Sequence, residues 1–232
     1  MTSESLKTQY QQVRNQVQQL AQQVQNHRVQ ILAVSKVHST AKIREAYALG
    51  ARYFGENYAQ ELASKAEELS DLTDIRWSYI GHIQSNKIRL IVEHANEIQS
   101  LASLKHGKLI AKAADEFNKP NYPVFIAVNA EGEASKNGIP LDQVSPFVTE
   151  LEAHCPSLEV QGLMCIPPRH YQDSLEKVPE LYRELRNLAN KVGQGRLSLG
   201  MSGDLRIAIE AGTDLVRIGT AIFGERPQKA RQ

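Results

Sequence analysis

Cysteine is scarce in this sequence, which has only Cys155 and Cys165 among its 232 residues. The two are too few for a disulfide framework, lack CxxC spacing, and are not accompanied by the clustered histidines of a zinc site. Long apolar runs are missing too, so there is neither the roughly 20-residue segment that spans a bilayer nor a signal-peptide core. We therefore expect no metal, no membrane partner and a reducing, cytoplasmic location.

An excess of charge of one sign is also missing. The 27 basic and 26 acidic residues give a formal net charge of +1, and the basic residues are scattered along the chain. Nucleic-acid-binding proteins usually gather basic residues on one face, so we expect no nucleic-acid partner. What the chain does have is 41% hydrophobic residues. Its length suits a single α/β barrel, a fold that typically takes roughly 250 residues.

From residue 31 to 224, short apolar runs alternate with helical patterns, as in parallel strands joined by crossover helices. The predicted strands are 31–35, 52–54, 77–80, 97–99, 124–128, 160–164, 197–199 and 215–218. The predicted helices include 41–49, 59–69, 102–117, 141–154, 175–192 and 205–211. Eight such units predict an α/β fold, a single-domain (β/α)8 TIM barrel. The competing architecture, a doubly wound open sheet, calls for GxGxxG after the first strand. That place holds Lys36-Val37-His38-Ser39, without a glycine.

An extra helix precedes the barrel, within residues 1–28. Apolar residues recur there at alternating steps of four and three, the stripe of an amphipathic helix: Leu6, Tyr10, Val13, Val17, Leu20 and Val24. The stripe covers fewer than three heptads, so packing across the floor of the barrel is favoured over a coiled-coil partner. We expect residues 1–232 to form one domain, a monomer, with the barrel in residues 31–224.

Lys36 ends the first predicted strand and carries the strongest chemical signal. A primary amine at the tip of a buried strand is desolvated, which favours its neutral form, lowers its pKa and allows it to form an imine with an aldehyde. The alternative is a lysine that reaches the rim of the barrel or pairs with a carboxylate.

The turns after the seventh and eighth strands have the parts of a phosphate site, which is where barrels frequently bind phosphate. Gly203 and Gly219 allow backbone N–H groups to approach an anion, and Ser202 and Thr220 add hydroxyl groups at the starts of two predicted helices. The alternative is that Ser202 and Thr220 are only helix caps.

Arg217, near the end of the eighth strand, keeps its proton and so requires an acceptor. Asp204 or Glu56 could serve, and so could the ring nitrogen of a bound pyridine, which would then stay unprotonated. An imine-forming amine, a phosphate site and a cation between them match pyridoxal 5'-phosphate (PLP).

Six motifs occur in one order along the chain, and together they closely resemble the YggS/PROSC family of pyridoxal-phosphate homeostasis proteins. They are AVSK at 33–36, GEN at 55–57, IGHIQSNK at 80–87, GLM at 162–164, LSLGMSGD at 197–204 and VRIGTAIFG at 216–224. The resemblance implies a barrel like the N-terminal domain of alanine racemase, with PLP held as an internal aldimine on Lys36. It also implies that Asn57 lies beside the cofactor, and it gives no firm role to the family-like segment 128–138.

The resemblance further implies a non-catalytic carrier that buffers PLP or delivers it to PLP-dependent apoenzymes, with an indirect effect on amino-acid and keto-acid balance. Alanine racemase needs a second domain and a tyrosine delivered across a dimer, for which we expect no room after Gly224. Tyr79, His82 and Cys165 are the residues that could reach the mouth as an acid or base. A weak racemase or decarboxylase is the alternative, and a cofactor-free Schiff-base aldolase is a third class.

Overall fold

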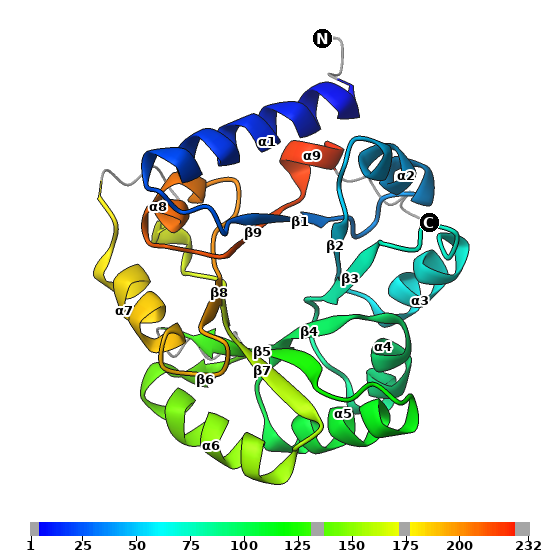
Figure 1. The fold of residues 1–232 in the computed structure, drawn as a ribbon, viewed down its shortest axis with the longest axis vertical. Helices are drawn as coiled ribbons and strands as arrows, with labels where there is room; N and C mark the ends of the chain where they lie inside the picture. Colours follow the sequence, from blue (N-terminus) through cyan, green and yellow to red (C-terminus); the bar gives the residue numbers. More distant parts are fainter. Residues whose placement is uncertain (1–4, 131–136, 172–176, 226–232) are drawn as a thin grey trace, which may run out of the picture.

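The computed structural model describes residues 5–130, 137–171 and 177–225. Eight strands form a closed barrel in the order β4-β3-β2-β1-β9-β8-β7-β5, with pairing of β4 to β5 closing the ring (Figure 1). All the pairings are parallel. The barrel strands are β1 Gln30–Val34, β2 Tyr53–Glu56, β3 Arg76–Tyr79, β4 Glu97–Leu101, β5 Tyr122–Asn129, β7 Leu158–Cys165, β8 Arg196–Ser198 and β9 Leu215–Ile218. The predicted barrel is confirmed, and the open sheet is excluded.

Helices surround the barrel and follow the predicted pattern, with two differences. They are α2 Thr40–Ala48, α3 Ala59–Glu68, α4 Ile88–His94, α5 Leu104–Glu116, α6 Val144–His154, α7 Glu180–Ala189, α8 Leu205–Glu210 and α9 Thr220–Phe223. The sequence pattern did not single out α4, a short helix behind the 3-10 turn η1 Ser85–Lys87. Helix α7 starts at Glu180 instead of 175, after the N-cap Pro179, and residues 175 and 176 of the predicted helix lie outside the described residues.

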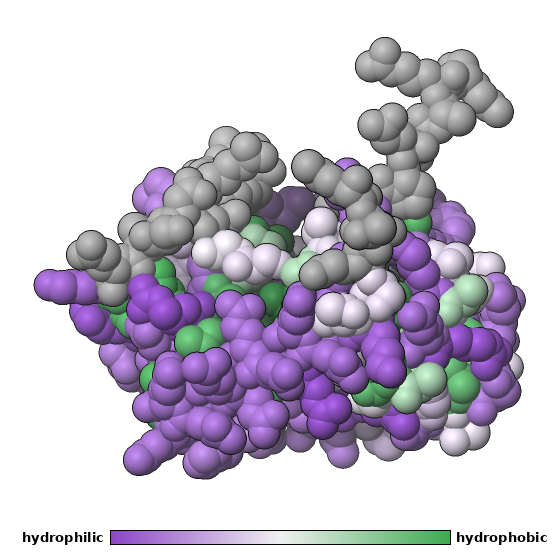
Figure 2. Space-filling view, turned by 90° about the horizontal axis from the view of Figure 1, so that it is seen from above, coloured by the Kyte–Doolittle hydropathy of each residue, from purple (hydrophilic) through white to green (hydrophobic). Residues whose placement is uncertain are grey.

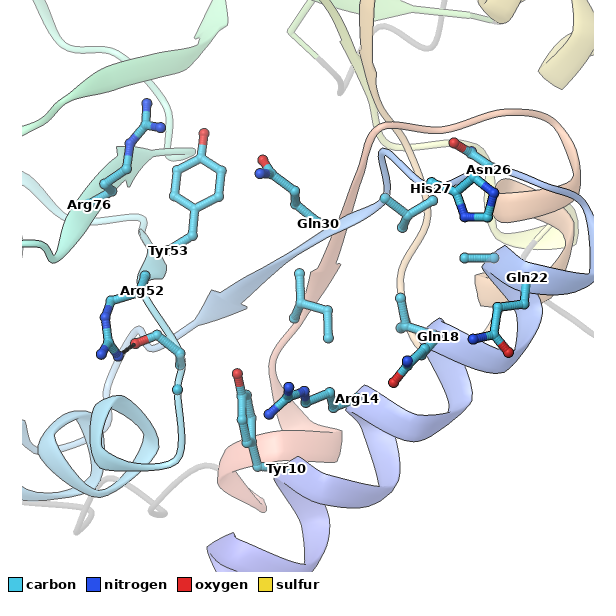
Figure 3. A pocket seen from close by; sticks show the side chains of 16 residues that line it. Tyr10, Arg14, Gln18, Gln22, Asn26, His27, Gln30, Arg52, Tyr53 and Arg76 are labelled. Atoms are coloured by element: carbon cyan, nitrogen blue, oxygen red, sulfur yellow. Dashed lines mark hydrogen bonds between the residues drawn. The ribbon is translucent and has the colours of Figure 1, made fainter.

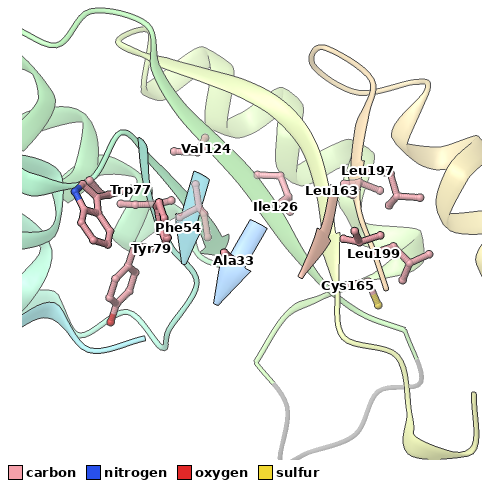
Figure 4. Close-up of a cluster of buried hydrophobic side chains, with 14 of the residues drawn as sticks. Ala33, Phe54, Trp77, Tyr79, Val124, Ile126, Leu163, Cys165, Leu197 and Leu199 are labelled. Carbon is pink, nitrogen blue, oxygen red and sulfur yellow. The ribbon is translucent and has the colours of Figure 1, made fainter. Parts of the chain in front are cut away.

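A two-residue strand, β6 Ile139–Pro140, pairs with the end of β5 and stands outside the ring. The two-residue side-chain period of the strands separates two apolar layers. Ala33, Phe54, Ile126 and Leu163 belong to the large cluster packed with the helices, part of which is drawn in Figure 4. Residues next to these in the chain, together with Leu215 of β9, form a second cluster that we place inside the barrel: Leu32, Tyr53, Phe125, Ala127, Met164 and Leu215. The apolar core therefore fixes which residues of each strand face inward.

The N-terminal helix α1 Leu6–Gln23 packs against α2, α8 and α9, on the outer ring (Figure 1). The prediction that it crosses the floor of the barrel was wrong. Helix α9 has only four residues, so α1 supplies the outer layer beside β9 and β1 that a longer last helix would supply. Its glutamine-rich face points away from the core, and the face of the molecule seen in Figure 2 is largely hydrophilic. None of the described helices is both long and apolar enough to span a membrane.

Candidate functional site

All seven residues that the sequence predicts to bind the cofactor line a single cavity of about 370 Å³. It opens at the carboxyl ends of the barrel strands, and we call it the mouth cavity. The seven are Lys36, Asn57, Ser202, Gly203, Arg217, Gly219 and Thr220. They come from the ends of β1, β2, β8 and β9, so closure of the barrel brings together residues up to 184 positions apart in the chain.

Side chains of α3 hold the peptide groups on both sides of Lys36. Lys65 donates from Nζ to the carbonyl oxygen of Ser35 (2.8 Å), and the N–H of Val37 donates to Oε1 of Glu61 (2.6 Å). Lys65 and Glu61 also form an ion pair at 2.6 Å. Val37 has φ +62°, a left-handed conformation that β-branched residues rarely adopt. Such a backbone persists only where its surroundings fix it, so these contacts set the direction in which Lys36 leaves the chain.

Glu56, the last residue of β2, completes this arrangement from the inside. Its Oε1 accepts hydrogen bonds from Lys65 Nζ (2.7 Å) and Ser35 Oγ (2.6 Å). Burial raises the pKa of Glu56, while the charge and hydrogen bond of Lys65 act to lower it. Lys65 is 5% exposed and Glu56 is fully buried. We call Glu56, Glu61 and Lys65 the α3 clamp, a charge group next to Lys36 in which Glu56 and Lys65 are buried and Glu61 is partly exposed.

Two turns, after β8 and β9, form a second wall of the mouth cavity beside the end of β1. Gly200 has φ +100°, and a Cβ there would meet Ala208 at 2.4 Å, so only glycine lets the chain turn after β8. Asp204 fixes this turn by accepting from the N–H of Met201 (2.6 Å) and from the Tyr182 hydroxyl (2.6 Å).

The backbone N–H groups of Ser202, Gly203, Gly219 and Thr220 have no hydrogen-bond acceptor within the part of the chain that the structure describes. Thr220 is the first residue of α9 and Gly219 is its N-cap, while Asp204 is the N-cap of α8. The alternative that Ser202 and Thr220 are helix caps is therefore wrong. Because α8 and α9 have six and four residues, the anion site depends on individual N–H groups more than on helix dipoles.

Arg217 is buried and held mainly by backbone oxygens. Nη1 donates to the carbonyl oxygen and the hydroxyl of Ser198, both at 2.7 Å, and Nη2 donates to the carbonyl oxygen of Cys165 at 2.6 Å. Ser198 donates onward to Gln99 (2.7 Å), whose amide donates to Glu97 (2.6 Å). These bonds lock the guanidinium in the barrel interior, facing the mouth cavity.

The predicted partners of Arg217, Asp204 and Glu56, are not its hydrogen-bond acceptors. Asp204 is engaged by Tyr182 and Met201, and Glu56 by the α3 clamp. Burial lowers the pKa of Arg217, although an arginine keeps its proton in a protein. Three of its five N–H groups are used in these bonds, which leaves donors for a group in the cavity.

Sequence reasoning missed the apolar and aromatic part of the wall. Ile80, Met164 and Ile166 line the mouth cavity, and His38 lines it with its ring stacked on Phe223 at 5.2 Å. The position of His38 two residues after Lys36 was a usable signal. Ile80 and Met164 fall within the family-like motifs at 80–87 and 162–164, but nothing in the sequence assigns the three apolar residues to the site.

Three residues predicted to reach the mouth do not line the mouth cavity. Tyr79 and Cys165 are buried among the residues packed with the helices, and burial raises the pKa of Tyr79 to about 12. His82 lines a neighbouring cavity of about 190 Å³ instead. Tyr79 and Cys165 follow the inward-facing positions by one residue, so the strand period turns them away from the mouth.

The residues present fit PLP. Asn57 has its side-chain oxygen Oδ1 buried without a hydrogen-bond partner among the described residues, and Gly81 packs so closely on Asn57 that a Cβ would lie 1.9 Å from its carbonyl oxygen. Backbone donors on one wall, an amine on the other and a cation below suit a planar molecule with a phosphate and an aldehyde. The described residues hold no group of three or more metal-ligating side chains. Residues 131–136 of the family-like segment 128–138 lie outside the described residues.

Comparisons with known proteins agree with this geometry. The family model "Alanine racemase, N-terminal domain" matches residues 9–227. A pyridoxal phosphate homeostasis protein of Vibrio cholerae is 43% identical over 205 residues, which cover 85% of this chain and 86% of the relative. The structure of PipY from Synechococcus elongatus with PLP bound has a TM-score of 0.79 and 30% identity, and covers 95% of this chain and 100% of that one.

Alanine racemase itself is a more distant neighbour. The enzyme from Bartonella henselae has a TM-score of 0.68 at 17% identity, and the match covers 92% of this chain but 58% of the enzyme. At that identity the likeness shows a shared barrel fold and carries no activity with it.

Proposed function

The chain belongs to the family of the alanine racemase N-terminal domain and, within it, to the pyridoxal phosphate homeostasis proteins, and on this premise we propose that it binds PLP in the mouth cavity and serves PLP homeostasis. One observation carries the proposal. The seven residues named from the sequence line one cavity, with Lys36 on one wall and unpartnered backbone donors on the other.

Each residue has a proposed role. When bound, PLP supplies an aldehyde that a primary amine can take up covalently, and Lys36 is the amine. The N–H groups of Ser202, Gly203, Gly219 and Thr220, with the two hydroxyls, hold the phosphate. Arg217 would direct its remaining N–H donors to the ring nitrogen, and Asn57, the residue after β2, would contact the cofactor.

We propose that the protein carries PLP without catalysing a reaction. A guanidinium at the ring nitrogen keeps that nitrogen unprotonated, which weakens the electron-withdrawing character of the ring that most PLP enzymes use. The alternative, a weak racemase or decarboxylase, has one observation in its favour, which is that the imidazole of His38 lines the mouth cavity. Incubation with common L-amino acids, followed by chiral and carbon dioxide analysis, separates the two.

The absorbance spectrum of the purified protein tests the proposal. We expect a visible band that borohydride removes, and its loss in Lys36→Ala with the fold retained in circular dichroism. Lys112→Ala, at an exposed lysine of α5, is the matched control and should keep the band. A colourless wild-type protein that gains no band on addition of PLP would refute the proposal and favour an aldolase-like barrel.

We further propose that the protein is a cytoplasmic monomer whose partners are PLP-dependent apoenzymes. Both cysteines are buried and neither forms a disulfide, as suits a reducing compartment. Light scattering after size exclusion tests the monomer. Recovery of activity by an apoenzyme mixed with the loaded protein, beside the same amount of free PLP, tests delivery.

A further inference from the structure

A chain of hydrogen bonds crosses the inside of the barrel and ends on Arg217. Nη1 of Arg217 donates to the hydroxyl of Ser198 (2.7 Å), which donates to Oε1 of Gln99 (2.7 Å). Nε2 of Gln99 in turn donates to Oε1 of Glu97 (2.6 Å). Ser198 lies on β8 and Gln99 on β4, which are not neighbours in the ring of strands, so their hydrogen bond spans the barrel interior. We call Glu97, Gln99 and Ser198 the interior relay.

Glu97 is fully buried at the inner end of the interior relay. Its Oε1 accepts a second hydrogen bond, from the Ser78 hydroxyl (2.9 Å), as an ionised carboxylate does. The Tyr53 hydroxyl is buried nearby: burial raises its pKa, and the charge of Glu97 acts in the same direction. Tyr53 lines a cavity beside the first residues of β1, β2 and β3, which is drawn in Figure 3. The relay and Tyr53 together therefore reach from the mouth cavity to the opposite end of the barrel.

The two ends of the interior relay force the direction of every hydrogen bond in it. A guanidinium can only donate hydrogen bonds, and an ionised carboxylate can only accept them. The Gln99 amide must therefore present its NH₂ group to Glu97 and its oxygen to Ser198. The single hydroxyl proton of Ser198 is used on Gln99, so the hydroxyl can only accept from Arg217. Glutamine suits the middle position because its side chain ends in both a donor and an acceptor.

The interior relay also connects two buried charges of opposite sign. Neither Glu97 nor Arg217 forms an ion pair within the part of the chain that the structure describes, although both are buried. The relay places two dipoles between them, each with its negative end toward Arg217. Burial lowers the pKa of Arg217 and the charge of Asp204 acts against this, but the hydrogen bonds of Asp204 go to Tyr182 and Met201. Glu97 is thus the carboxylate that hydrogen bonds link to the guanidinium.

We propose that Gln99 is a positioning residue for the cofactor and that Glu97, acting through it, is the remote counter-charge of Arg217. This inference rests on the proposed binding of PLP in the mouth cavity. The Ser198 hydroxyl and the carbonyl oxygens of Ser198 and Cys165 hold the guanidinium in one orientation, which directs its remaining donors to the ring nitrogen. Without the Gln99 amide the hydroxyl is free to rotate, so Arg217 loses one of its three fixed contacts. The contact to the ring nitrogen then weakens, while the contacts to the aldehyde and the phosphate stay.

Calorimetric titration of the apoprotein with PLP, and separately with its analogue in which C–H replaces the ring nitrogen, tests the proposal. The analogue keeps the aldehyde and the phosphate, so it reports every contact except the one to the ring nitrogen. We expect the wild type to bind PLP more tightly than the analogue. Gln99→Met, which keeps the length of the side chain, should reduce this preference by about tenfold, because a hydrogen bond from a charged donor is typically worth that much. The affinity for the analogue should stay within about twofold of the wild type.

Gln161→Met is the matched control. Gln161 lies on β7, and its amide donates to Glu159 (2.6 Å), outside both the interior relay and the mouth cavity. This variant should keep the wild-type preference for PLP. Glu97→Gln removes the charge but keeps an acceptor for Gln99, and it should lower the preference less than Gln99→Met does. Circular dichroism checks the fold of each variant, and if Gln99→Met does not fold, Glu97→Gln decides by the same ratio of affinities.

The ratio of the two affinities separates the possible outcomes. A wild type that binds PLP and the analogue equally would overturn the inference, because the ring nitrogen would then have no donor. A folded Gln99→Met that keeps the preference, or that loses affinity for both ligands alike, would overturn it too, since the second result is what a purely structural role predicts. An unchanged preference in Glu97→Gln would remove the counter-charge. A wild type that binds neither ligand would instead refute the proposed function, and this inference with it.

Discussion

The two walls of the mouth cavity are built from different materials. The wall that carries Lys36 is fixed by buried charges, because Lys65, Glu61 and Glu56 hold the neighbouring peptide groups. The second wall is made of the turns after β8 and β9, whose lining residues have backbone N–H groups without an acceptor among the described residues. An amine that must meet an aldehyde needs one fixed direction, whereas a phosphate with several oxygens can be held by any adequate set of donors. The difference predicts that substitutions in the α3 clamp act on the fold and those on the second wall act on affinity.

The largest effect is expected at the α3 clamp. Lys65→Met leaves the Glu56 carboxylate buried without its cation, so we expect the free energy of unfolding to fall by about 3–5 kcal/mol, together with loss of the visible band. Urea denaturation followed by circular dichroism measures it. Arg206→Met, which breaks an exposed i,i+4 pair on α8, is the control and should change stability far less. A near-neutral Lys65→Met would show that the clamp does not hold this wall.

On the second wall, Ser202→Ala combined with Thr220→Ala should weaken PLP affinity by about tenfold, because two hydroxyl donors to an anion are lost while the backbone donors stay. Both side chains are exposed, so the unfolding curve should stay in place. Titration of the apoprotein with PLP, monitored by absorbance, gives the affinity. Thr149→Ala on α6 serves as the control. Unchanged affinity in the double variant would argue against the phosphate site.

A smaller effect is expected in the pH dependence of stability, and it comes from the wall that carries Lys36. The pKa of Glu56 is raised in the folded chain, so the folded state holds this proton more tightly than the unfolded state does. Stability contributed by this group is therefore present below its ordinary pKa, near 4.5, and is lost as the pH rises through the folded value. Relative to Glu56→Gln, the wild type should lose stability across that window. Denaturation curves of both proteins at several pH values test the sign. A wild type that gains stability relative to Glu56→Gln as the pH rises would contradict it.

Much of this molecule could be predicted from its sequence because the strand signals are local. Short apolar runs marked all eight barrel strands to within a few residues. The polar residues that follow strand ends gave Lys36 and the two anion-site turns, and the family resemblance added Asn57. In a closed parallel barrel, residues at strand ends meet whatever their separation in the chain. The strand ends and the closed barrel are therefore enough to predict that the seven site residues lie together.

What could not be predicted depends on contacts between elements. Lys65 looks like any lysine on a helix, and only the packing of α3 against β2 brings it to Glu56. For Arg217 the sequence left a carboxylate and a pyridine nitrogen open as acceptors, and it did not reveal the carbonyl oxygens of Ser198 and Cys165 that hold the guanidinium. Helix α1 packs beside α9, which has only four residues and leaves part of the outer layer uncovered. The sequence pattern did not reveal how short α9 is.

The most direct test of the central claim is to locate the cofactor on the chain. The protein is saturated with PLP, reduced with borohydride, digested and analysed by mass spectrometry. The account predicts a single stoichiometric modification on Lys36, and none on Lys65 or Lys42, although both lie nearby in the β1–α2–α3 region. A modification on another lysine, or none at all with Lys36 intact, would contradict it.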